Sequence, residues 1–196
     1  MRIRALLLVS VLATTISAVG VSAASAATLF TTTAHTTRVT VGSTATADVV
    51  GNLDFTLPPG TVADRCTGGS FTLVVAQNSD ALISLRVGSG GFAGCFSSKT
   101  PTFTVPWTVT ITGAGTVRAP NLSYGATLHR LAYDMAGFPG MFVGNLESGV
   151  TALQPTAGTS PITINLENAA SLTNPSVGTE NLDGNLRLTT PWSLTN

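Results

Sequence analysis

An unbroken alternation of apolar and polar residues from Thr102 to Thr112 constrains the fold of this chain more than any other feature. Every second residue is apolar, and the residues between are threonine or proline. The apolar members are Phe103, Val105, Trp107, Val109 and Ile111. A period of two is that of a β-strand with one face in the core and one in water. Pro106 lacks an N–H for the ladder, so we expect a sheet edge or a bulge there.

Similar patterns recur along the chain. Asn185–Thr195 alternates again, with Leu186, Leu188, Trp192 and Leu194 on one face. Further strands are expected at Arg38–Val41, Thr46–Val50, Leu53–Leu57, Phe71–Ala76, Leu82–Val87, Phe92–Phe96, Thr127–Asp134, Met141–Leu146 and Ile162–Leu166. Turns are expected at the glycine and proline clusters 58–60, 68–69, 88–91, 113–115 and 137–140, and Asp183-Gly184 is typical of a two-residue hairpin.

One segment is compatible with two structures. Leu128, Leu131 and Met135 have helical spacing, whereas Leu131, Tyr133 and Met135 also alternate. We favour a strand because glycines flank the segment and its neighbours are strands.

Many short strands separated by turns predict one all-β domain. We expect an antiparallel β-sandwich, of jelly-roll or other Greek-key type, with one disulfide. Immunoglobulin topology is not favoured, because its tryptophan lies between the two cysteines, whereas Trp107 follows Cys95.

The N-terminus predicts export. A positive start, an apolar run and Ala24-Ser-Ala26 have the layout of a secretory signal peptide over residues 1–26, with an uncleaved membrane anchor as the alternative. Residues 27–37 are rich in threonine and are expected to form a tether or a loosely ordered first strand. The sandwich domain would then span 38–196, in a secreted or cell-surface protein.

Cys66 and Cys95 are the only cysteines. In an exported chain they are expected to form a structural disulfide. A metal site would need more ligands than these two and the distant His35 and His129.

Charge excludes several classes of partner. Charged residues make up only 9% of the chain, and the loss of Arg2 and Arg4 with the leader leaves seven basic against nine acidic residues. Nucleic acids and acidic membranes need a basic surface, so neither is an expected partner.

Catalytic groupings are weak. A triad would have to use His129 with Asp134 and Ser123, but on a strand His129 and Asp134 would face opposite sides. Asp48 with Asp54, or Glu180 with Asp183, could serve as acid and base. These acidic residues lie beside turn signals, where a structural role is expected. We therefore expect no enzyme.

Ligand-binding signals are equally limited. Asn181, Asp183 and Asn185 could hold calcium around Gly184, but an ordinary hairpin uses the same residues. We expect no metal and no cofactor. Asn121-Leu-Ser123 fits the N-glycosylation pattern.

Four aromatic residues could contact a ligand. Trp107, Trp192, Tyr124 and Tyr133 would form a sugar-stacking platform if exposed. Both tryptophans lie on apolar faces of alternating strands, which favours burial in the core.

The layout resembles small exported all-β proteins of actinobacterial type, many without an assigned function. The resemblance rests on the leader, Cys66-Thr-Gly-Gly-Ser-Phe71, Phe92-Ala-Gly-Cys95, the Trp107 strand and Asp183-Gly184. Many of those proteins carry a second cysteine pair that this chain lacks. The resemblance implies an exported β domain and no catalytic residues.

Three functional hypotheses follow. The leading one is a non-catalytic β domain that acts at the cell surface, in the wall or in the extracellular matrix. A carbohydrate-binding module and a membrane β-barrel or pore are the alternatives, the last because one face of each strand would meet lipid. Partners could be cell-wall or extracellular polysaccharide, or a second copy of the chain.

Overall fold

The computed structural model describes residues 27–31, 34, 36–57, 60–96, 101–118, 121–153, 162–166 and 172–195. The predicted signal peptide lies outside these residues. Twelve strands and no helix occur in the described parts. They are β1 (Thr28–Phe30), β2 (Thr44–Leu57), β3 (Thr61–Asn78), β4 (Leu82–Cys95), β5 (Thr102–Phe103), β6 (Trp107–Arg118), β7 (Asn121–Asp134), β8 (Phe142–Leu153), β9 (Thr163–Leu166), β10 (Leu172–Asn174), β11 (Gly178–Leu188) and β12 (Ser193–Thr195).

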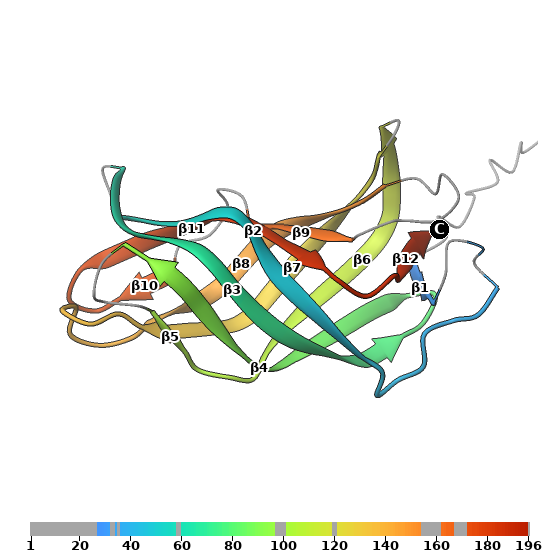
Figure 1. Cartoon of the computed structure of the whole chain (residues 1–196), viewed down its shortest axis with the longest axis horizontal. Helices are drawn as coiled ribbons and strands as arrows, with labels where there is room; N and C mark the ends of the chain where they lie inside the picture. The colour runs from blue at the N-terminus through green and yellow to red at the C-terminus, as the bar shows by residue number, and fades with distance from the viewer. Residues whose placement is uncertain are drawn as a thin grey trace, which may run out of the picture.

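The large sheet closes into an eight-stranded antiparallel barrel (Figure 1). Consecutive strands pair from β2 through β3, β4, β6, β7, β8 and β9 to β11. Pairing of β11 with β2 then closes the ring. The short β10 pairs with β8 and with β11. It therefore lies between the same two strands as β9, farther along them. The connectivity is therefore that of an up-and-down barrel.

The expected sandwich is wrong, although the all-β class and the disulfide are confirmed. A sandwich and a barrel have the same local pattern, because each strand buries one face and exposes the other. What separates them is the β11–β2 pairing, which joins Leu188 to Ala47 and Asn181 to Thr56. A barrel is the architecture of the membrane-barrel alternative, and that part of the alternative is confirmed.

The barrel buries its apolar faces inward. On β6, Trp107, Val109 and Ile111 are buried, as the alternation predicts. Side chains between the buried positions on neighbouring strands are partly or fully exposed and mostly polar. They include Thr44, Thr46, Asp48, Arg65, Thr67, Thr72, Thr108, Thr110 and Thr112. The outer surface of these strands is therefore polar.

Pro106 interrupts the segment that alternates best. The chain forms β5, leaves the sheet at 104–106 and resumes as β6 at Trp107. The Val105–Pro106 bond is cis. The short β5 pairs with the end of β7, the strand with which β6 also pairs. Thr102–Thr112 is thus two strands, because proline cannot donate to the ladder.

Several predicted turns are wrong, because their glycines lie inside long strands. The clusters 68–69, 88–91 and 113–115 fall within β3, β4 and β6, whereas Gly60 and 137–140 do lie in turns. At Gly90 the φ angle is +147°, and an added Cβ would lie 2.5 Å from the Phe71 ring. Glycine here lets β4 bend over a buried aromatic ring instead of ending the strand.

Asp183-Gly184 is not a hairpin either. Both residues lie within β11, opposite an irregularity of β2, where the register shifts between Asp183 and Asn185. A Cβ at Gly184 would lie 2.6 Å from Leu53 Cδ1. The glycine is required for close packing of two strands, which a local turn pattern does not distinguish.

The first and last strands of the described residues, β1 and β12, pair at one end of the barrel as a separate two-stranded sheet. Asn78, at the end of β3, fixes β1 in place. Its side chain accepts the Leu29 N–H at 3.0 Å and donates to the Leu29 and Val39 carbonyls, both at 2.9 Å. Thr28–Phe30 therefore forms the first strand, while Arg38 makes only an isolated bridge to Phe30.

Among the described residues, no helix is long and apolar enough to cross a membrane.

We predict that Gly90→Ala lowers the free energy of unfolding by about 2–4 kcal/mol, because it combines an unfavourable φ with a clash against Phe71. Gly88→Ala is the matched control, since Gly88 has open space around its Cβ position. Urea unfolding of both variants measures the difference. Equal stabilities would contradict this role of Gly90.

Cys66 and Cys95 are paired residues of β3 and β4 and form the predicted disulfide, which links residues 29 apart in sequence. Loop entropy alone gives it about 3.5 kcal/mol. We predict that the double variant Cys66→Ala, Cys95→Ala has a lower melting temperature than the wild type. Reductant should lower the melting temperature of the wild type to that of the variant. A wild-type melting temperature unaffected by reductant, with reduction verified by thiol counting, would contradict this.

Candidate binding site at one end of the barrel

The two ends of the barrel differ in structure. At the pocket end, as we call it, β2 turns into β3, β4 ends at Cys95, β7 turns into β8 and β10 turns into β11. The opposite end carries β1 and β12 (Figure 1). Large exposed apolar side chains other than Val41 lie at or near the pocket end: Val62, Phe96, Val105, Met141, Val143 and Val177. The pocket end is therefore the end at which an apolar contact could form.

Aromatic rings fill the barrel interior behind this end. Phe71 makes edge-to-face contacts with Phe92 and Trp107, at centroid distances of 5.2 and 5.8 Å, and Tyr133 stacks on Phe142 at 5.3 Å. The cavity that remains among these rings and the leucines has a volume of about 10 Å³. This is room for one water molecule at most. Around this cavity, the described aromatic and leucine side chains form a packed core.

A carboxyl group lies inside this apolar core. Glu180 is fully buried at the start of β11, and the Tyr133 hydroxyl donates a short hydrogen bond to its Oε2. Within the described residues, Glu180 Oε1 has no hydrogen-bond partner. Burial raises the pKa of Glu180 to about 7, the Tyr133 hydrogen bond opposes the rise, and the charge of Asp64 adds to it. Burial and Glu180 together raise the pKa of Tyr133.

Asp64, on β3, lies close enough to Glu180 for its charge to raise the pKa of Glu180. Ala63, the residue before it, has no partner in the β2 register, where Val62 pairs with Thr56 and Asp64 with Phe55. Such a bulge redirects side chains locally. Asp64 is 3% exposed, and its Oδ1 accepts the Arg65 backbone N–H at 2.8 Å. A carboxylate oxygen lies within 4.8 Å of both disulfide sulfurs.

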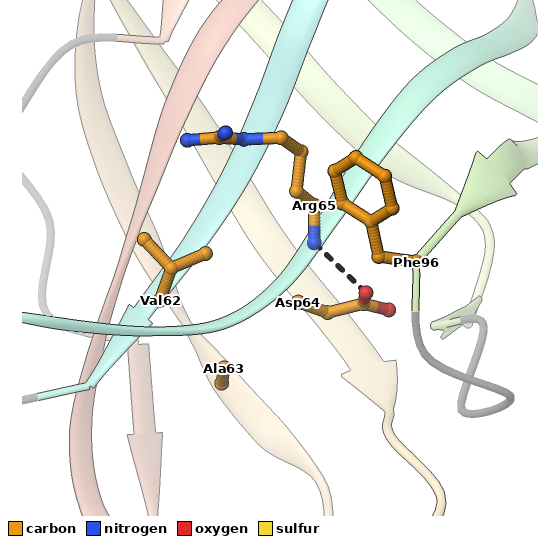
Figure 2. Close-up of a pocket in the computed structure, with 5 residues that line it drawn as sticks. All are labelled: Val62, Ala63, Asp64, Arg65 and Phe96. Atoms are coloured by element: carbon orange, nitrogen blue, oxygen red, sulfur yellow. Dashed lines mark hydrogen bonds between the residues drawn. The ribbon is translucent and has the colours of Figure 1, made fainter.

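Beside Asp64 is an open pocket of about 370 Å³, lined by Val62, Ala63, Asp64, Arg65 and Phe96. Phe96 follows the disulfide, and its N–H donates to the Arg65 carbonyl at 2.9 Å. Its side chain is 75% exposed. Figure 2 shows the Phe96 ring and the Asp64 carboxylate on the same side of β3, with the Arg65 side chain extending away from that carboxylate. The pocket thus combines an aromatic face with a buried acid.

The Arg65 guanidinium is held by Asp54. Arg65 Nη2 donates to Asp54 Oδ2 at 2.7 Å and Nε donates to Oδ1, which gives a bidentate pair between neighbouring strands. The hydrogen bond and charge of Asp54 raise the pKa of Arg65. Two parallel hydrogen bonds fix the plane of the guanidinium, so Arg65 forms a rigid wall of the pocket.

The four aromatic residues named from the sequence lie elsewhere. Trp107, Trp192, Tyr124 and Tyr133 are all buried, and none presents a ring face to solvent. Burial raises the pKa of Tyr124 to about 12. These rings stabilise the core. Among the described residues, Phe96 is the aromatic residue classed as exposed.

Of the acid and base candidates, Asp54 and Asp183 are partners across β2 and β11, whereas the contacts of the pairs named from the sequence differ within each pair. Asp48 accepts a hydrogen bond from Ser70, Asp54 binds Arg65, and Glu180 points inward while Asp183 lies on the outer face. His129 Nε2 is hydrogen-bonded to Thr110 Oγ1 at 2.8 Å.

The expectation that His129 and Asp134 face opposite sides is wrong. The register of β7 shifts between Leu128 and Leu131, and Arg130 has a φ of 60°. The inward-pointing residues of β7 therefore have even numbers up to Leu128 and odd numbers from Leu131 onward. His129 and Asp134 consequently both lie on the outer face. A bulge inserts one residue and resets the alternation. The strand predicted for this segment is confirmed as part of β7.

Ligand-type atoms of three acidic, histidine or cysteine side chains come together once in the described residues, at Asp64, Cys66 and Cys95. The two cysteines are joined in the disulfide, so their sulfurs are not thiolate ligands. The calcium candidates Asn181, Asp183 and Asn185 lie along β11, paired with Thr56, Asp54 and Val50 of β2. They are part of a ladder, not of a loop that wraps around an ion.

Comparisons with protein-family models, with curated proteins and with solved structures found no match.

Sequence analysis misses Phe96, Asp64 and Glu180 as a group. The sequence does contain a signal for Glu180. It is separated by an even number of residues from Leu182, Leu186 and Leu188, which all point inward on β11. An acid on the apolar face of an alternating strand is expected to be buried. Asp64 offered no such signal, because the bulge at Ala63 breaks the pattern around it.

The buried carboxyl group predicts a stability that depends on pH. The folded pKa of Glu180, about 7, exceeds its ordinary 4.5, so the folded state holds the proton more tightly. The stability gained from this tighter proton binding is fully present below pH 4.5 and is lost as the pH rises through 7. We predict a free energy of unfolding about 2–3 kcal/mol lower at pH 8 than at pH 5.

Urea unfolding at both pH values, with Glu180→Gln and Asp183→Asn, measures this effect. Glu180→Gln should remove most of the difference, because an amide carries no titrating proton. Asp183→Asn, on the outer face of the same strand, should keep it. A Glu180→Gln protein with the wild-type pH dependence would assign the effect to another group.

Proposed function

We propose that this chain is an exported, non-catalytic β-barrel that binds its ligand at the Phe96 pocket and acts at the cell surface or in the surrounding matrix. The single observation that supports this is the pocket of about 370 Å³, where a 75% exposed Phe96 faces a buried Asp64. An exposed aromatic ring beside a concave polar wall is a common anchor for a ligand. Export is the expectation from the leader.

The packed interior supports binding at the end of the barrel rather than inside it. In barrels with an internal ligand, the interior keeps space for that ligand. Here the aromatic rings leave about 10 Å³. The apolar side chains around the pocket end extend the contact surface beyond the pocket itself.

A membrane-embedded barrel is the second candidate, and the closure of the eight-stranded sheet is the observation that favours it. A lipid-embedded barrel needs an outward apolar band about 25 Å tall. The described outer positions of β2, β3 and β6 instead carry mainly threonine, aspartate and arginine. A barrel that faces water is therefore the first candidate. Recovery of a monodisperse barrel without detergent supports it, and recovery only in detergent supports the second.

Co-sedimentation with cell walls, insoluble polysaccharides and liposomes tests the binding site. We predict saturable pelleting with one of these solids, and a dissociation constant at least about tenfold larger for Phe96→Ala, because truncation of a central aromatic contact typically costs about 2 kcal/mol. Val41→Ala is the matched control, since Val41 is also exposed but lies at the opposite end. Pelleting that both variants leave unchanged would exclude the Phe96 pocket as the site.

A further inference from the structure

We propose that the β10–β11 hairpin is a pH-operated flap, which is closed on the barrel while Glu180 is protonated and opens when Glu180 is ionised. The flap comprises residues 172–180, which are β10, its turn and the first residues of β11. The inference does not depend on the Phe96 pocket. It rests on how the flap is attached to the barrel and on what Glu180 contacts when the flap is closed.

The flap extends beyond the ladder that closes the barrel. In the part of the chain that the structure describes, residues 178–180 pair with β10, and the pairing of β11 with β2 starts after them. On the other side, β10 pairs with β8 through Thr173 and Val143, and Thr173 Oγ1 donates to the Val143 carbonyl at 3.2 Å. Asn174 Nδ2 donates to the Gly140 carbonyl at 2.8 Å. The flap can therefore leave the wall without loss of the β11–β2 pairing.

Glu180 forms the buried contact between the flap and β7. Its side chain is fully buried, and the Tyr133 hydroxyl donates to its Oε2. Tyr133 stacks on Phe142 of β8 and makes an edge-to-face contact with Phe55 of β2. Leu172, the register partner of Glu180 on β10, is also fully buried. The closed flap thus places a carboxyl group against a cluster of aromatic rings.

Protonation of Glu180 stabilises this contact, and ionisation weakens it. Two ionisable groups from other strands act on Glu180: Tyr133 of β7, whose hydrogen bond favours the ionised form, and Asp64 of β3, whose charge disfavours it. The other strands around the contact, β2, β8 and β10, contribute the uncharged side chains just named. Burial is the largest effect, and it raises the pKa of Glu180 to about 7. The closed flap therefore holds the proton more tightly than an open flap, in which Glu180 meets water.

The opening equilibrium should therefore depend on pH. Glu180 has a pKa of about 7 in the closed state, and in the open state its ordinary value of 4.5 applies, so opening becomes more favourable as the pH rises between these two values. Linkage gives an increase of about 50- to 100-fold in the opening constant from pH 5 to pH 8. Acid thus keeps the stacked rings of Tyr133 and Phe142 covered, and neutral to alkaline conditions favour their exposure.

Hydrogen exchange of the full chain, followed by mass spectrometry at pH 5 and pH 8, tests the proposal. The exchange rate of a segment, divided by that of an unstructured peptide at the same pH, gives the opening constant of the segment. We expect the opening constant of residues 172–180 to rise about 50- to 100-fold between the two pH values. It should respond only weakly to low concentrations of urea, because opening of the flap exposes little surface.

Residues 107–112 of β6 are the internal reference for this measurement. They should open through global unfolding, with a smaller opening constant and a strong response to urea. Equal opening constants and equal urea responses of the two segments would overturn the flap, because residues 172–180 would then open only with the whole barrel.

Two variants assign the pH dependence to Glu180. Glu180→Gln carries no titrating proton, so the opening constant of residues 172–180 should change less than about threefold between pH 5 and pH 8. Asp183→Asn is the matched control, because Asp183 lies on the outer face of the same strand, and it should keep the wild-type increase. The wild-type increase in Glu180→Gln would overturn the role of Glu180.

Should Glu180→Gln fail to fold, Tyr133→Phe provides the second test. The hydrogen bond from Tyr133 lowers the pKa of Glu180, so without the hydroxyl the increase in the opening constant should extend to a higher pH than in the wild type. An increase that ends at the same pH as in the wild type would overturn the contact of Glu180 with Tyr133 as the interaction that closes the flap.

Discussion

The pairing of β11 with β2 is the constraint on which the rest of this structure depends. It joins strands more than one hundred residues apart and converts an open meander into a closed ring. Closure gives every barrel strand two neighbours and sends the inward side chains of all of them to one core. The aromatic rings can then pack around Phe71 and Tyr133 with almost no space left. These described rings thus pack the interior around one small cavity.

Local periodicity predicts most of the strands and their inward faces, but neither the architecture nor the change of face at the β7 bulge. Trp107, Val109 and Ile111 point inward as their alternation requires. The same alternation suits a sandwich equally well, so closure could not be inferred from it. Glycine was the second source of error, because Gly90 permits close packing inside a strand while the same residue type also ends strands. Both errors concern contacts between distant segments, which a local pattern does not contain.

The candidate site was less predictable than the fold. The disulfide followed from two cysteines in a chain expected to be exported, and it lies at the edge of the site. Glu180 was considered only with Asp183, although an odd spacing on a strand sends such residues to opposite faces. Its actual neighbours, Tyr133 and Asp64, come from β7 and β3. A site assembled from three strands of a closed barrel is visible only once the register of those strands is known.

The pairing of β1 with β12 has a practical consequence for the orientation of the molecule. β1 and β12 lie at the end of the barrel away from Phe96 (Figure 1). An attachment made at β1 or at β12 would leave the pocket pointing outward from the point of attachment. Because Thr28 and Thr195 are partners in the same ladder, a short linker could join β12 to β1, and new ends could be opened in an exposed turn. The barrel is thus suited to display from a surface and to circular permutation.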